Sequence, residues 1–182
     1  MEAKDSATAA GGALAGMTNR ERAEEMDELD SFIENVTRII EAEDEKIYSK
    51  EVIEEFKNPT HAYRMTDADA EGIADGLCGD TMEMYIKVDG ERIKACSFYT
   101  DGCGATIACG NRLARHVEGM DIEAARNVSP EELISLLNGL PEEHKHCASL
   151  SVLALRNAIR KLEERRFCKP ESASRIAKNG KS

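Results

Sequence analysis

The chain has 182 residues, of which 41% are hydrophobic but only 4% aromatic, so its core must be built from aliphatic side chains and methionine. Its formal net charge of −11 repels phosphate backbones and argues against nucleic-acid binding. No apolar run approaches the roughly 20 residues that span a bilayer. We therefore expect no membrane segment and a cytoplasmic location.

The N-terminal part is predicted to comprise a disordered tail over residues 1–17 and an accessory amphipathic helix over 18–45. Thr18 is the predicted N-cap of this helix, and Glu21 closes a capping box. Apolar residues follow the steps of a heptad seam: Met26, Leu29, Ile33, Val36 and Ile40. The seam has two interpretations, packing on its own domain or contact with a partner or a second copy.

Residues 46–166 are predicted to form one domain that begins with a helix over about 47–57. Apolar residues then alternate with polar ones over 82–88, which predicts a half-buried strand. Asp89-Gly90 is a hairpin signal, and the chain returns as a partner strand over 93–100.

The remainder of this domain is predicted to be helical. One helix starts at Cys103 and ends at Gly119, and Ser129 caps another one. The last helix covers about 143–166, and the basic residues 167–182 are predicted to be a flexible tail. A small antiparallel sheet followed by helices makes the expected fold class α+β.

The six cysteines contain no CxxC pair, which argues against a zinc ribbon or a thioredoxin-like site. Nothing indicates export, so we expect a reducing compartment and no disulfides. The sequence around Cys96, Cys109 and Cys168 offers no reason for reactivity. We interpret Cys96 and Cys109 as packed core thiols.

The other three cysteines lie in polar or glycine-rich surroundings. Cys103 starts a helix between two glycines, and Cys147 follows His146 in the first turn of the last helix. Helix N-termini favour anions, so both thiols are expected to have a lowered pKa. Cys78 lies in a glycine-flanked loop, two residues before Asp80. Three thiolates, a carboxylate and an imidazole suit zinc or an iron–sulfur cluster, whereas the simplest alternative is three small buried hydrophobes.

Four stretches resemble the IscU/NifU-type iron–sulfur cluster assembly scaffolds, in the same order along the chain. The resemblance covers about residues 46–164 and implies a compact α+β domain with a three-stranded antiparallel sheet and helices packed against it. The stretches are YSKEVIEEFKNP (48–59), CGDTMEMYIKV (78–88), DGCGATIA (101–108) and GLPEEHKHCASLSVLALRNAI (139–159).

The resemblance implies roles for five residues. Cys78, Cys103 and Cys147 would be the cluster ligands and sulfur acceptors, Asp80 the carboxylate that keeps the cluster labile, and His146 an alternative ligand. Among the three thiols we favour Cys147 as the first sulfur acceptor, because it lies at a helix start beside a histidine.

The resemblance also implies a carrier rather than an enzyme. Its members take persulfide sulfur from a cysteine desulfurase, bind iron and build a 2Fe–2S cluster. Some then form 4Fe–4S clusters, often through homodimers, and the product passes to apo iron–sulfur proteins. Purified protein is also expected to carry zinc, since the same ligands suit it.

Two rival functions use the same residues. One is a zinc protein with Cys78, Asp80, Cys103 and Cys147 as a structural site. The other is a thiol-dependent sulfurtransferase with a Cys147–His146 pair, the least favoured because adjacent helical side chains diverge by about 100°.

The stretch before the last cysteine departs from the family pattern. The related bacterial and mitochondrial scaffolds usually carry LPPVK, which a dedicated chaperone reads, whereas this chain has LPEEH with Lys145 one place later. Two acidic residues in place of Pro and Val argue against that chaperone contact. We interpret His61, His116 and His144 as surface histidines.

Overall fold

The computed structural model describes residues 19–167, and their side chains from residue 26 onward. The chain divides into two compact units, the first ending at Lys46 and the second beginning at Ile47, and each is described by itself. Thr18, Cys168 and the two predicted tails, apart from Phe167, lie outside the described residues.

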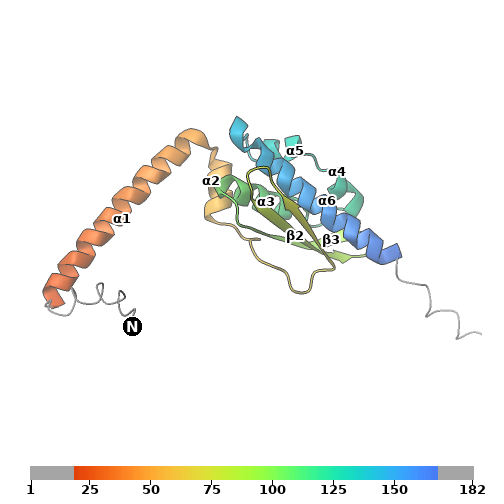
Figure 1. Ribbon diagram of the computed structural model, residues 1–182, viewed down its shortest axis with the longest axis horizontal. Coiled ribbons are helices and arrows are strands. Elements are labelled where there is room, and N and C mark those ends of the chain that lie inside the picture. The colour runs from red at the N-terminus through yellow and green to blue at the C-terminus, as the bar shows by residue number, and fades with distance from the viewer. Residues whose placement is uncertain (1–18, 168–182) are drawn as a thin grey trace, which may run out of the picture. The chain divides into compact units, whose positions relative to one another are not determined.

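Helix α1 (Asn19–Ile47) confirms the predicted N-terminal helix and is coloured orange in Figure 1. The seam residues are all exposed: Met26 64%, Leu29 56%, Ile33 51%, Val36 38% and Ile40 55%. Whether they pack on this domain or on a partner therefore stays a prediction. Among the described residues, no helix is both long and apolar enough to cross a bilayer.

The second unit confirms the α+β prediction with a three-stranded antiparallel sheet in the order β1-β2-β3. Its elements are α2 (Lys50–Lys57), β1 (Ala70–Asp75), β2 (Thr81–Asp89), β3 (Arg92–Thr100), α3 (Gly104–Val117), α4 (Ile122–Asn127), α5 (Pro130–Leu136), the 3₁₀ helix η1 (Glu142–His144) and α6 (Lys145–Phe167). Ser129 caps α5 as predicted, because its hydroxyl accepts a hydrogen bond from the Glu132 backbone N–H at 3.1 Å.

Strand pairing gathers the small and apolar side chains onto one face of the sheet. Directly paired residues share a face, and this face carries Ala70, Gly72, Ala74, Met82, Met84, Ile86, Cys96 and Phe98. Helix α6 packs on β1 and β2, and α3 packs on β3 (Figure 1). The domain thus has two layers, with these helices covering one face of the sheet.

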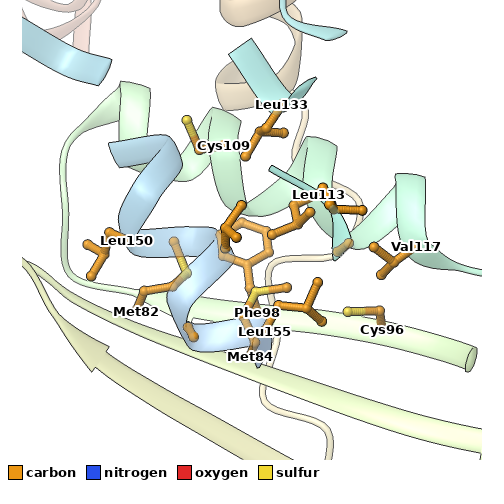
Figure 2. Close-up of a cluster of buried hydrophobic side chains, with 14 of the residues drawn as sticks. Met82, Met84, Cys96, Phe98, Cys109, Leu113, Val117, Leu133, Leu150 and Leu155 are labelled. Atoms are coloured by element: carbon orange, nitrogen blue, oxygen red, sulfur yellow. The ribbon is translucent and has the colours of Figure 1, made fainter. Parts of the chain in front are cut away.

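The core lies between these layers and is built mainly from aliphatic side chains and methionine (Figure 2). Phe98 is 1% exposed and is surrounded by methionine and leucine side chains (Figure 2). Each such side chain contributes about 1.5–3 kcal/mol on burial. Cys96 and Cys109 are fully buried in this core, which confirms them as packed thiols.

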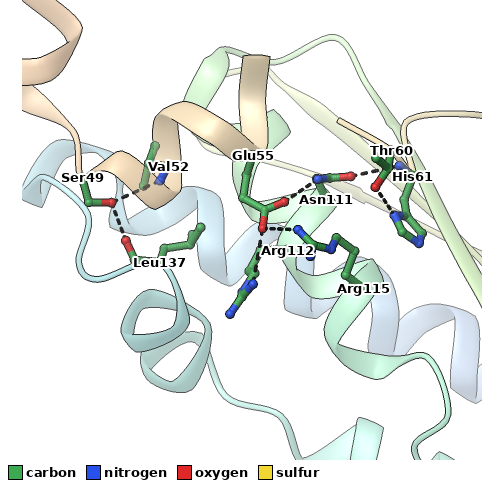
Figure 3. Close-up of polar contacts among 9 residues, drawn as sticks. All are labelled: Ser49, Val52, Glu55, Thr60, His61, Asn111, Arg112, Arg115 and Leu137. Atoms are coloured by element: carbon green, nitrogen blue, oxygen red, sulfur yellow. Dashed lines mark hydrogen bonds and ion pairs between the residues drawn. The ribbon is translucent and has the colours of Figure 1, made fainter. Parts of the chain in front are cut away.

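Helix α2 is joined to α3 by a buried carboxylate that the sequence did not reveal. Glu55 is 4% exposed and forms an ion pair with Arg115 at 2.8 Å, and the side-chain amide of Asn111 donates to it (Figure 3). Asn111 in turn accepts a hydrogen bond from the backbone N–H of His61 at 3.0 Å. This network fixes α2 and the segment after it against α3.

Strand β1 and helix α6 approach each other closely at Gly72. A Cβ atom there would lie 2.1 Å from the carbonyl oxygen of Ala154 and 2.2 Å from the backbone nitrogen of Ala158. Farther along the chain, the Cβ position of Gly76 lies 3.1 Å from the Leu150 side chain. Strand β1 and helix α6 therefore run antiparallel, and the end of β1 lies beside the beginning of α6.

We expect Gly72→Ala to lower the free energy of unfolding by about 3 kcal/mol, the upper end for overpacking, because the methyl group would meet rigid backbone atoms. Urea denaturation measures the change. Glu71→Ala, an exposed neighbour on the opposite face of the same strand, is the control and should change stability by less than ~0.5 kcal/mol. Equal effects of the two substitutions would contradict the close approach.

Candidate metal centre

Three segments meet where β1 ends and α6 begins. Cys103 is the N-cap of α3, Cys147 is the third residue of α6, and the loop between β1 and β2 carries Cys78 and Asp80. Gly102 permits this meeting, since a Cβ there would lie 2.6 Å from the Asp80 carboxylate and 2.8 Å from the Thr106 side chain. The prediction that Cys103 and Cys147 lie at the starts of two helices is thus confirmed.

Within the part of the chain that the structure describes, two thiols and one imidazole form a group of potential metal ligands. A ligand atom from each of Cys103, His144 and Cys147 lies within 4.8 Å of the others. Cys103 is exposed, His144 half-buried and Cys147 buried, so the group sits at the edge of the core. Sulfur and imidazole nitrogen are the ligands that zinc prefers, and thiolates also hold iron–sulfur clusters.

The three histidines interpreted as surface residues, His61, His116 and His144, are all half-buried, and the one that the interpretation misplaced most is His144, which lies at the site. Its Nε2 atom lies 3.0 Å from the Tyr48 hydroxyl, and its ring lies 5.5 Å from the tyrosine ring. The spacing His144-x-x-Cys147 was the available signal, because residues three apart share one face of a helix.

A buried hydroxyl links the other candidate ligands. Thr106 is fully buried, and its Oγ1 lies 3.0 Å from an Asp80 carboxylate oxygen, 3.3 Å from the Cys147 sulfur and 3.6 Å from the Cys103 sulfur. One hydroxyl has one hydrogen, so it donates to only one of these acceptors at a time. Thr106 therefore holds Asp80 next to both thiols.

Cys78 and His146 lie at the periphery of the group. Cys78 is exposed in its loop, yet near enough that its charge raises the pKa of Cys147. His146 is half-buried with Nε2 3.6 Å from the Cys147 sulfur, so these neighbours do contact each other despite their expected divergence. The structure thus brings together Cys103 and Cys147, with Asp80 joined through Thr106.

The expected low pKa of Cys147 is wrong for the metal-free protein. Its pKa is raised to about 11, chiefly by burial, while the hydrogen bond from Thr106 opposes the shift and the charge of Cys103 adds to it. Desolvation of the thiolate outweighs the favourable field of the helix N-terminus. Burial likewise raises the pKa of the core thiols Cys96 and Cys109.

We expect iodoacetamide to alkylate Cys147 of the metal-free protein at least ~100-fold more slowly at pH 8 than an exposed thiol of ordinary pKa. The raised pKa lowers the thiolate fraction, so reactivity should increase as the pH approaches 11. Peptide mapping by mass spectrometry, with the exposed Cys78 as the internal reference, measures both rates. In denaturing urea the two rates should converge, and equal rates in the native protein would contradict the burial of Cys147.

Comparisons with known proteins agree on one family. Two iron–sulfur cluster assembly scaffold proteins, IscU 1 and IscU 2 of Archaeoglobus fulgidus, are each 38% identical over 114 residues, covering 62% of this chain and 74% of theirs. The crystal structure of a NifU-like N-terminal protein from Brucella abortus matches with a TM-score of 0.52 at 24% identity, over 65% of this chain and 95% of that one. The family described as the NifU-like N terminal domain matches residues 47–169, and the chain belongs to this family.

Proposed function

We propose that this chain is a scaffold for iron–sulfur cluster assembly, a carrier rather than an enzyme. The observation that carries the proposal is the meeting of Cys103, Cys147 and a nearby imidazole at the edge of the core, in a member of this family. The relatives from Archaeoglobus fulgidus and Aquifex aeolicus bear the name of cluster assembly scaffold. Cys78 and Cys103 are exposed, so donors and recipients can reach this side of the site.

The proposed cluster ligands are Cys78, Cys103 and Cys147, with Asp80 as a labile fourth ligand and His146 as its alternative. The contacts of Thr106 with Asp80 and Cys147 support this set, as does the contact of His146 with Cys147. A carboxylate is a harder and weaker ligand for iron in a cluster than a thiolate. Such a site would hold a 2Fe–2S cluster, or a 4Fe–4S cluster between two copies, less firmly than four cysteines would.

Sulfur would enter from a cysteine desulfurase that carries a persulfide. A scaffold thiolate attacks the outer sulfur, the desulfurase thiolate leaves, and the persulfide remains on the scaffold. Cys147 stays our proposed acceptor, and its burial requires the start of α6 to open for attack. Apo iron–sulfur proteins would then receive the finished cluster.

We expect anaerobic reconstitution with iron, cysteine and a cysteine desulfurase to form a cluster on the wild-type chain. Cys78→Ala, Cys103→Ala and Cys147→Ala should each abolish it, because each removes a ligand. Visible absorbance, Mössbauer spectra and quantified iron and sulfide report the cluster, and transfer to an apo-ferredoxin reports delivery.

Cys109→Ala is the matched control. It removes a buried thiol from α3, the helix that begins after Cys103, and this thiol is not part of the proposed site. It should leave cluster formation intact. Persulfide mapping of the wild type before iron is added identifies the acceptor thiol. Absence of a cluster, together with zinc that resists exchange, would overturn the scaffold function and favour a structural zinc site.

A further inference from the structure

Tyr48 connects the beginning of α2 to the candidate metal centre, although the sequence places it far from every cysteine. Its hydroxyl lies 3.0 Å from Nε2 of His144, and the two rings pack with centroids 5.5 Å apart. His144 is the imidazole that lies with the thiols of Cys103 and Cys147. The tyrosine thus contacts a potential ligand directly.

The position of Tyr48 is set by contacts that do not involve His144. The next residue, Ser49, caps α2 by accepting a hydrogen bond from the Val52 backbone N–H at 3.1 Å, and its hydroxyl donates to the Leu137 carbonyl at 2.5 Å (Figure 3). The Tyr48 ring meets Phe56 edge-on at 6.3 Å.

Phe56 in turn reaches the helix that begins after Cys103. Its ring lies 3.4 Å from the Cβ position of Gly104, the first residue of α3. Tyr48 is therefore held in place by α2 and by the turn after α5, through Ser49, and by the start of α3, through Phe56. It offers the imidazole a fixed partner.

With the tyrosine hydroxyl as the partner of Nε2, Nδ1 is the ring nitrogen left for a metal. A neutral imidazole carries one N–H and one lone pair. If Nε2–H donates to the tyrosine oxygen, Nδ1 keeps its lone pair for a cation. Histidine ligands generally donate their other N–H to an oxygen in this manner, which fixes the tautomer and the ring orientation.

The spacing of the group fits a small tetrahedral ion. Zinc bonds of about 2.3 Å to sulfur and 2.0–2.1 Å to nitrogen put ligand atoms about 3.4–3.8 Å apart in a tetrahedron. The three ligand atoms here lie within 4.8 Å of one another, so shifts of about 1 Å would close the site. Asp80 is not one of these three ligands, but Thr106 holds its carboxylate near both thiols, where it would supply a fourth ligand.

We propose that Tyr48 is a positioning residue that presents Nδ1 of His144 to a thiophilic divalent cation, zinc or iron(II), bound by Cys103 and Cys147. The ion binds before sulfide is present and does not require it. That this binding is the step by which iron enters cluster assembly rests on the proposed function. His144 stands at the fifth place of LPEEH and brings an imidazole to the turn directly before α6.

Cobalt(II) titration of the full-length, metal-free chain under anaerobic conditions tests the proposal, because its absorption bands report both ligand type and geometry. The variants are His144→Ala and Tyr48→Phe, with Tyr63→Phe as a matched control at a half-exposed tyrosine. Competition with a chelator measures cobalt and zinc affinity without any sulfide.

Tyr48→Phe should keep the thiolate-to-cobalt bands and weaken affinity by about 10–100-fold, the usual effect of losing a hydrogen bond to a ligand. His144→Ala should weaken affinity further and shift the visible bands, because a nitrogen ligand is lost. Tyr63→Phe should match the wild type. Unchanged urea midpoints of the metal-free variants separate ligand positioning from loss of fold.

Wild-type affinity and spectra in His144→Ala would overturn the ligand role of His144. Unchanged or tighter binding in Tyr48→Phe would overturn the positioning role and assign Nε2 as the ligand atom. Cobalt binding that depends on His144, in a chain that forms no cluster with a desulfurase, would sustain this inference and reject the scaffold function. If the His144→Ala variant still assembles a cluster and binds cobalt as the wild type does, the scaffold function would be kept and this inference rejected.

Discussion

The close packing of β1 on α6 at Gly72 is the constraint on which the candidate site depends. With no side chain between them, strand and helix touch through their backbones and run antiparallel, so the loop after β1 reaches the beginning of α6. The start of α3 lies near the same loop and the beginning of α6, because α3 packs on β3 and α6. Two helix N-termini and one loop therefore converge, and each brings a thiol.

Burial and reactivity oppose each other at this convergence. Cys147 lies inside the edge of the core, where its thiol stays protonated in the metal-free protein. A bound cation would reverse this balance, because it stabilises the thiolate that burial disfavours. Deprotonation of Cys147 and metal binding are thus linked, which protects the buried thiol until iron or zinc arrives. Exposed Cys78 has no such protection.

Residues other than the cysteines also shape the site. Thr106 puts a buried hydroxyl between a carboxylate and two thiols, and Glu55 locks α2 against α3 through Arg115. The position of α2 in turn sets where Tyr48 meets His144. A change in α2 would therefore alter metal binding at the proposed site without touching a thiol. Supporting residues act in this way by orienting the ligands.

The sequence by itself determined the features that local signals specify. The alternation over 82–88, the turn at Asp89-Gly90, the cap at Ser129 and the helix starts at Cys103 and Cys147 all depend on neighbours within a few residues. Only the tertiary structure decided the pKa of Cys147 and the partners of His144, Thr106 and Glu55. Burial and long-range contact arise when α2, α3 and α6 pack together, and neither is encoded in the spacing along one segment.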